Sequence, residues 1–303
     1  MKNLKENFYR AYGLNICSSV VIPQLSSIKF NSGNSNSNVD VIIRLGNVKI
    51  PKNNILVEGN YFKTTKNSFY LFWEDFGKFK ISNGNEIILD PIPNINEELF
   101  TYFIVGALMG ALLYQRDYLI LHASSVNINH KAVAFLGDSG SGKSTIAMSL
   151  QKRGFPIVTD EILAIKFDKS NEPYVYPSFP KVRLNYETMS KLSNESSNVF
   201  NEQHGLLKNF YNAQYRFSEK PLSLKSIYIV EKSIDTILKR LKPQRALIEL
   251  IGNSFCIQMS DNSKKFSHFN NCSYLARNLP IYTLKMRKSF DSIPVVHSLL
   301  LKE

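Results

Sequence analysis

The sequence predicts an α/β protein with a β-rich N-terminal domain. Short runs of alternating apolar and polar residues fill the first ninety positions, as in strands. Between residues 118 and 158, apolar strand-like runs surround a glycine-rich turn and a helix-like segment. The hydrophobic fraction of 44% and the charged fraction of 20% exclude disorder or coiled coil for the chain as a whole. A length of 303 residues is consistent with about two domains.

Residues 1–93 are predicted to form the β-rich domain. The runs Val39–Leu45 and Ser68–Trp73 alternate as strands with one buried face do. Turn residues separate these runs, so we expect mainly antiparallel pairing.

The second domain is predicted to span residues 94–303 and to begin with an apolar helix. Two prolines end the strand pattern, and Asn94 or Asn96 can cap a helix that continues to about Gln115. Its apolar run, Leu99–Tyr114, is shorter than the roughly 18 residues of a membrane span. We therefore expect a buried helix and no membrane partner.

A strand, turn, helix, strand unit follows. Strands are expected at Tyr118–Ala123, Ala132–Leu136 and Phe155–Val158, with a helix from about Lys143 to Arg153. Such a unit builds a parallel sheet.

Three further segments are expected beyond this unit. Leu224–Glu231 is predicted to be a strand and Gln244–Ile251 a helix. The polar segment Ser193–Tyr215 is predicted to be loop with short helix.

The charge and the cysteine content indicate the expected cellular compartment and the possible partners. Three widely spaced cysteines support neither a disulfide framework nor a zinc site, and no apolar segment follows the basic N-terminus, so we expect a cytoplasmic protein. The net charge is +12, of which residues 151–303 carry +9. A basic half can attract phosphates, nucleic acid or an acidic peptide, but a compositional bias toward Lys, Asn and Ile throughout the chain is the favoured explanation.

One motif carries chemistry. The eight residues from Gly137 to Ser144 match G-x-x-x-x-G-K-[ST], in which glycines let backbone N–H groups converge on phosphate. Lys143 can neutralise the β- and γ-phosphates, and the Ser144 hydroxyl can bind Mg²⁺. The alternative is a glycine turn that binds nothing. The predicted nucleotide-binding residues are Gly137, Asp138, Ser139, Gly140, Ser141, Gly142, Lys143, Ser144 and Thr145.

Acidic residues follow the next strand. Asp160 and Glu161 are expected at the sheet edge that holds the glycine loop, where Asp160 can hold the metal or accept a proton. His122 lies at the end of the expected strand Tyr118–Ala123, the one before the strand that leads into the glycine loop, and it can reach the same edge. A solvated acidic pair and a core histidine are the alternatives.

The segments Leu121–Val126, Phe135–Thr145 and Arg153–Glu161 together resemble the kinase domain of HPr kinase/phosphorylase. The sequence is more similar to HPr-kinase-like proteins found beside lasso-peptide and other ribosomal-peptide biosynthetic enzymes. Tyr9–Leu14 and Asp40–Gly46 resemble the N-terminal region of that second group.

The resemblance implies a P-loop kinase domain of the HPr kinase and phosphoenolpyruvate-carboxykinase-like type that phosphorylates serine on a protein or peptide. It places His122 and Asp160 at the transferred phosphate. The family usually has an aspartate where this chain has Glu161, which leaves the contribution of that position open. The segment used for the reverse, phosphorolytic reaction is not recognisable, so that activity is not expected.

Four basic residues are weaker candidates for contacts with phosphate or peptide. Lys181 and Arg183 alternate on one strand face, which an exposed strand explains equally well. Lys208 and Arg245 are equally weak candidates for such contacts.

These observations predict an ATP- and Mg²⁺-dependent serine kinase whose acceptor is a peptide, such as a lasso-peptide precursor. Ser144 and Asp160 are the expected metal ligands, and Asp160, His122, Lys143 and Glu161 the expected catalytic residues. The N-terminal domain would recognise the peptide or support the kinase domain. Nucleic acid is not an expected partner, and a homo-oligomer is left open. A small-molecule kinase and a nucleotide-sensing module remain the alternatives.

Overall fold

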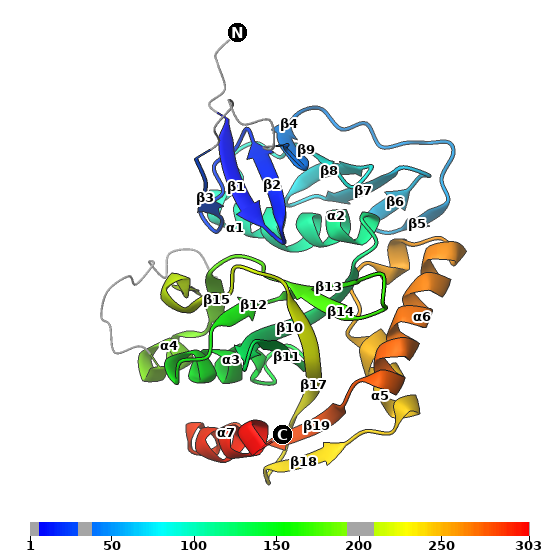
Figure 1. The fold of residues 1–303 in the computed structure, drawn as a ribbon. Helices are drawn as coiled ribbons and strands as arrows, with labels where there is room; N and C mark the ends of the chain where they lie inside the picture. Colours follow the sequence, from blue (N-terminus) through cyan, green and yellow to red (C-terminus); the bar gives the residue numbers. More distant parts are fainter. Residues whose placement is uncertain (1–5, 30–37, 193–208, 303) are drawn as a thin grey trace. The chain divides into compact units, whose positions relative to one another are not determined.

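The computed structural model describes residues 6–29, 38–192 and 209–302, and it shows a mixed α/β chain (Figure 1). The chain forms two compact units. The first contains residues 1–120 and 255–270, and the second contains residues 121–254 and 271–303. These units differ from the expected division at residues 93 and 94, because the apolar helix and a later segment pack with the first sheet.

The first unit is built on a nine-stranded sheet in the order β3-β1-β2-β4-β9-β8-β7-β6-β5. Most pairs are antiparallel as expected, but β4 pairs in parallel with both β2 and β9, which corrects the expectation for the centre of the sheet. Its strands are β1 (Asn7–Ala11), β2 (Leu14–Ser18), β3 (Ser26–Ser27), β4 (Val41–Leu45), β5 (Val57–Gly59), β6 (Phe62–Thr64), β7 (Ser68–Trp73), β8 (Gly77–Ser82) and β9 (Glu86–Pro91).

Helix α1 (Glu97–Phe103), the π-helical turn η1 (Ile104–Leu108) and α2 (Met109–Gln115) form one continuous helical segment. Asn96, one of the two expected caps, accepts a hydrogen bond from the Leu99 N–H at 2.9 Å. The ring of Phe103 contacts those of Trp73 and Phe79 at centroid distances of 4.8 and 5.2 Å. The segment Glu97–Gln115 is long and apolar enough to cross a membrane, yet 61% of its most apolar window is buried within the protein. It therefore packs as a core helix.

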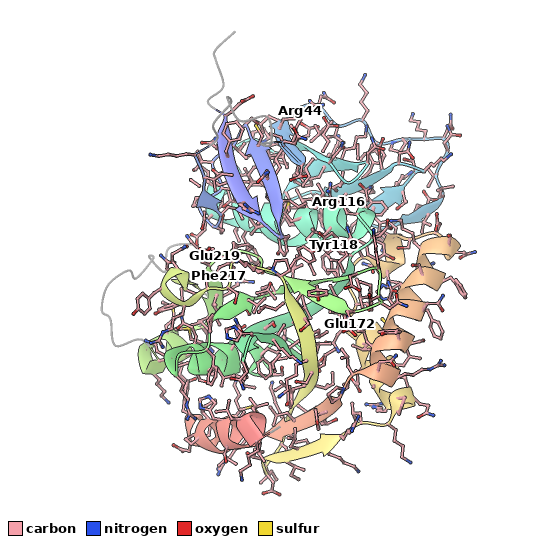
Figure 2. The ribbon with its side chains drawn as sticks, in the orientation of Figure 1. Arg44, Arg116, Tyr118, Glu172, Phe217 and Glu219 are labelled. Carbon is pink, nitrogen blue, oxygen red and sulfur yellow. The ribbon has the colours of Figure 1, made fainter. Side chains whose placement is uncertain are left out.

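Two arginines of the first unit, both labelled in Figure 2, form polar contacts within that unit. Arg44 of β4 forms an ion pair with Glu86 at 2.9 Å. Arg116, which follows α2, donates to the Gly84 carbonyl at 2.9 Å and so ties the helical segment to the turn between β8 and β9. The unit also contains the short helix η3 (Ile257–Met259) and the first part of α6 (Asn262–Asn278).

The second unit has an eight-stranded sheet in the order β11-β10-β13-β14-β17-β19-β18, with β12 paired to β10. Because β17 also pairs with β11, the pairing β11-β10-β13-β14-β17 closes on itself. The strands are β10 (Leu119–Ile128), β11 (Lys131–Leu136), β12 (Ile157–Thr159), β13 (Ile162–Phe167), β14 (Pro173–Tyr176), β17 (Leu222–Lys232), β18 (Ile237–Arg240) and β19 (Ile281–Met286).

The expected parallel unit is present only in part. Strands β11 and β12 point the same way, but β10 lies between them and pairs antiparallel with both. Strand β10 also continues five residues past Ala123, so His122 lies near the beginning of its strand and not at the end. It still reaches the loop after β11, because Ala123 pairs with Leu136.

Helices pack around this sheet. α3 (Lys143–Lys152) contributes Ile146, Met148 and Leu150 to a core that also contains Phe135 and Val296. The remaining elements are α4 (Tyr186–Leu192), α5 (Pro243–Gly252), α7 (Ile293–Lys302), η2 (Gln214–Arg216), η4 (Phe290–Ser292) and the strand pair β15 (Lys181–Leu184) with β16 (Asn209–Asn212). Strand β16 corrects the expectation of loop at residues 209–212, whereas η2 begins within the same segment as the expected short helix. Residues 193–208 lie outside the described part of the chain.

Candidate functional site

The glycine loop joins the end of β11 to the beginning of α3. Gly137, Gly140 and Gly142 have φ values of 134°, 76° and 112°, which side chains rarely allow. A Cβ on Gly137 would lie 2.5 Å from the Val230 carbonyl oxygen, whereas one on Gly140 would meet no described atom within 4 Å. Gly137 therefore serves close backbone packing, and the face at Gly140 is open to a ligand.

Asn253, which follows α5, holds the base of this loop. Its Oδ1 accepts the Gly137 N–H at 3.1 Å, and its carbonyl oxygen accepts the His122 N–H at 2.9 Å. Asn253 therefore connects the loop to β10. No pattern in the sequence indicated this role, since Asn253 is distant from the motif.

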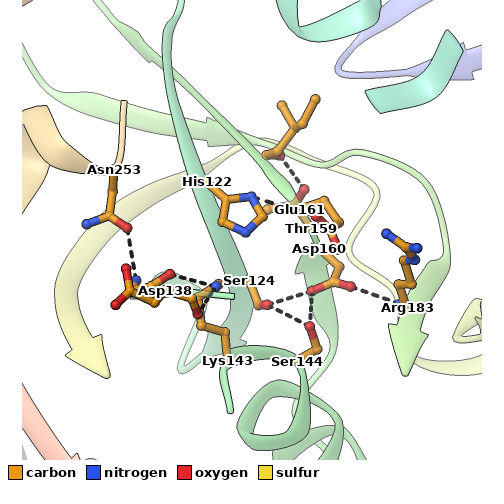
Figure 3. Close-up of polar contacts among 12 residues, drawn as sticks. His122, Ser124, Asp138, Lys143, Ser144, Thr159, Asp160, Glu161, Arg183 and Asn253 are labelled. Atoms are coloured by element: carbon orange, nitrogen blue, oxygen red, sulfur yellow. Dashed lines mark hydrogen bonds and ion pairs between the residues drawn. The ribbon is translucent and has the colours of Figure 1, made fainter. Parts of the chain in front are cut away.

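Lys143 is only 7% exposed, and its ammonium donates to the carbonyl oxygens of Gly137 and Asp138 at 2.7 and 3.0 Å (Figure 3). The first N–H groups of α3 have no acceptor within the helix. A lysine charge, helix N–H groups and an open glycine backbone are the parts that bind phosphate oxygens.

Ser141 supplies an independent test of fit. Its hydroxyl oxygen is buried and has no hydrogen-bond partner among the described residues. Leaving a buried hydroxyl unpaired costs about 1–3 kcal/mol. A phosphate oxygen at the loop would satisfy it, so the loop fits a phosphorylated ligand.

Asp160 lies at the centre of a polar cluster. Its Oδ1 accepts hydrogen bonds from the hydroxyls of Ser124 and Ser144, at 2.5 and 2.9 Å (Figure 3). Its Oδ2 accepts the backbone N–H of Arg183 at 2.9 Å. The structure thus brings the last residue of the glycine motif and the predicted acidic residue into direct contact.

Burial raises the pKa of the Asp160 carboxyl above its ordinary value, since only 4% of the residue is exposed. The charge of Glu161 raises this pKa further, and the bonds from Ser124, Arg183 and Ser144 oppose the rise. A carboxylate with a raised pKa is better suited to accept a proton.

Glu161 occupies a constrained turn. Its φ is 71°, and the Ile162 N–H donates to the Asp160 carbonyl at 3.0 Å, which closes a three-residue γ-turn of the strained type. Its carboxylate lies 3.6 Å from His122 Nδ1, an ion-pair distance for a protonated histidine. The turn therefore directs Glu161 toward a histidine whose side chain is 39% exposed.

A cavity of about 430 Å³ joins these groups, a size typical of small-ligand sites. All of its lining residues belong to the second unit. It includes the predicted residues His122, Ser139, Gly140, Ser141, Gly142, Lys143, Ser144, Thr145, Asp160, Glu161 and Arg183.

Other predicted residues lie elsewhere. Lys181 is on β15 but does not line the cavity, and burial lowers the pKa of its ammonium. Arg245 forms an ion pair with Glu249 at 2.6 Å on α5, away from the cavity. Lys208 lies outside the described residues.

Sequence reasoning missed Ser124 as a site residue. The available signal was a polar pair, Ser124 and Ser125, within an otherwise apolar strand. The two differ because Ser125 donates to the Val133 carbonyl inside the sheet, whereas Ser124 donates to Asp160.

The described residues contain no group of three or more His, Cys, Asp or Glu side chains able to hold a metal by themselves. A cation here would need the Ser144 and Asp160 oxygens together with oxygens of a ligand. Mg²⁺ is commonly held in this way, by one or two carboxylates plus substrate phosphates.

No family model matches the chain, and no curated protein matches it. Among solved structures, the Hpr(Ser) kinase/phosphatase from Coxiella burnetii is similar, with a TM-score of 0.33 and 10% sequence identity. The similarity covers 60% of this chain and 94% of that chain. We therefore base the function on the residues of the site.

Proposed function

We propose that the protein is an ATP- and Mg²⁺-dependent phosphotransferase of the HPr-kinase-like type. The observation that carries the proposal is the contact between the Ser144 hydroxyl and Asp160, beside the open glycine loop. This contact places a buried carboxylate beside the last residue of the loop, where it can reach both a bound cation and an acceptor hydroxyl. A phosphotransferase needs such a carboxylate, for the metal and for the acceptor proton.

The residues present fit both ATP and Mg²⁺. The loop backbone, Lys143 and Ser141 would bind the phosphates, and Ser144 and Asp160 would hold the metal. When bound, Mg²⁺ would supply charge neutralisation at the β- and γ-phosphates.

In the transfer, the acceptor hydroxyl oxygen forms a bond to the γ-phosphorus while the bond to the β,γ-bridging oxygen breaks, and ADP leaves. The hydroxyl proton passes to the Asp160 carboxylate. His122, beside Glu161, assists at the same face, and Lys143 stabilises charge on the transferring group.

The proposed acceptor is a serine of a peptide, in a cytoplasmic setting where ATP is available. The expected peptide is the precursor of a lasso or related ribosomal peptide, and the first unit would provide its recognition surface. The resemblance of the segments around His122, the loop and Asp160 supports this choice.

The test is incubation of the full chain with MgATP and a co-encoded serine-containing peptide, with small hydroxylated metabolites in parallel. Mass spectrometry should find one added phosphoryl group on the peptide, and Lys143→Ala should reduce its formation at least a hundredfold. Phosphorylation of a metabolite in preference to any peptide would favour the small-molecule kinase. ATP binding without transfer to any acceptor would favour a nucleotide sensor.

A further inference from the structure

The cavity extends beyond the phosphate loop to a second end, where apolar side chains meet the charged residues Glu187, Lys191 and Lys288. Met286 and Ile293 line this end and are almost fully buried, and the half-buried ring of Phe290 lines it with them. Lys191 of α4 places its ammonium over the Phe290 ring, 4.6 Å from the centroid. Ser289, Asn185 and Thr188 contribute polar groups to the same lining.

Sheet topology separates this end from the reactive carboxylates. His122 and Asp160 come from β10 and from the turn after β12, on one side of β11. Met286 ends β19, which runs parallel to β11 on its other side, with β17 between them. The glycine loop therefore lies between Asp160 and the segment from Met286 to Phe290, at the edge where ligands of α/β sheets bind.

Close contacts show that this second end borders the loop. Met286 Sδ lies 3.9 Å from where a Cβ on Gly142 would be, directly before α3. On α3, the Thr145 hydroxyl approaches that of Thr188 on α4 at 3.4 Å. A ligand with phosphates at the loop and its γ-phosphoryl group toward Asp160 would thus have its other end at Phe290.

We propose that this end is a nucleobase site in which the base stacks on the Phe290 ring and packs against Met286 and Ile293. The inference rests on the proposed binding of ATP at the loop and adds where its base lies. A flat apolar face with polar groups at its rim suits a base, since every base has a π-face and a polar edge. Because the Lys191 ammonium covers one face of the Phe290 ring, the base would stack on the opposite face.

Calorimetry on the full chain separates this inference from the proposed function, with MgATP and inorganic tripolyphosphate as the two ligands. Phe290→Ala should weaken ATP binding about tenfold or more, because it removes base stacking. It should leave tripolyphosphate binding unchanged, which also shows that the variant is folded. Phe290→Tyr should retain ATP binding.

A matched control is Phe266→Ala, which removes a phenylalanine ring that is 68% exposed on α6 and does not line the cavity. It should bind both ligands as the wild type does.

If Phe290→Ala binds ATP normally while Lys143→Ala loses both ligands, the base site is wrong and the phosphate site stands. If Phe290→Ala instead raises only the KM for a peptide, this end holds the acceptor. If the wild type binds neither ligand, the proposed function fails, and the base site with it.

Discussion

At the scale of single residues, the buried Asp160 carboxyl combines a cost in stability with the proposed role of proton acceptor. Its folded-state pKa is raised by burial, so the carboxyl holds a proton more readily in the folded chain than in the unfolded one. That contribution to stability is present at low pH and is lost as the pH rises through the folded-state pKa. The ionised form therefore lowers stability, and it is also the form that can accept a proton.

Asp160→Asn should separate these two effects. The asparagine oxygen can accept the Arg183 N–H while its amide donates to the two serine hydroxyls, so the cluster stays bonded. We expect phosphoryl transfer to fall about a hundredfold or more, with only a modest loss of ATP affinity. The melting temperature without ligand should stay equal or rise. A variant that loses ATP binding and transfer equally would contradict the role of Asp160.

Glu161 is a second residue whose position implies a role. The γ-turn directs its carboxylate toward His122, whose Nδ1 lies 3.6 Å from it. We expect Glu161→Gln to lower kcat about tenfold with little change in the KM for ATP, because the histidine loses its charged partner. Glu161→Asp should recover part of the rate, since it restores the charge. An unchanged kcat in Glu161→Gln would show that the turn is only structural.

At the scale of elements, the sequence predicted the local pieces of the site better than their assembly. The loop and α3 were predictable, because glycine positions and helix signals are local. The insertion of β10 between β11 and β12 was not, because pairing depends on partners far along the chain. The contacts of Asn253 and of the Arg183 N–H with the site were not predictable for the same reason, because they join residues 116 and 23 positions apart in the sequence.

Helix α7 packs on α3 through a buried histidine. His297 Nε2 lies 2.8 Å from Ser149 Oγ, whose hydroxyl donates to the Ile146 carbonyl, so Nε2 carries the proton. Nδ1 faces the Arg153 guanidinium at 3.2 Å and accepts from it. Burial, with the Arg153 charge adding to it, lowers the pKa of His297 to about 4.

This packing predicts a loss of stability in acid. The unfolded chain gains the His297 proton below its ordinary pKa of 6.5, whereas the folded chain resists it until about 4. Between pH 7 and pH 4 the group should therefore cost about 3 kcal/mol of unfolding free energy. Urea unfolding of the wild type and of His297→Gln should be measured across this range. As the pH falls from 7 to 4, the unfolding free energy of the wild type should decrease by about that amount relative to the variant.

His268 in the first unit also has a pKa lowered to about 4 by burial. Its contribution is common to both proteins and cancels in the difference. A difference that does not change with pH would contradict the assignment to His297.

At the scale of the whole molecule, the candidate site belongs to one unit. Every residue that lines the cavity lies in the second unit. MgATP should therefore slow amide hydrogen exchange in residues 121–145, 157–163 and 281–293, and leave the strands of residues 41–91 unchanged. Exchange measured by mass spectrometry tests this. Equal protection of the nine-stranded sheet would place part of the nucleotide site in the first unit.

The path of the chain has a consequence for synthesis on the ribosome. Residues 121–254 lie between two stretches of the first unit, whose later stretch bonds to the earlier one. The Thr64 hydroxyl donates to the Met259 carbonyl, and the Ser260 hydroxyl donates to that of Tyr114 at 2.6 Å. The N-terminal sheet is therefore made first but acquires its last partners only after most of the chain has emerged. Contacts between residues this far apart in the sequence form slowly. Until residues 255–270 have been synthesised, the N-terminal sheet lacks these contacts and is exposed to binding by chaperones.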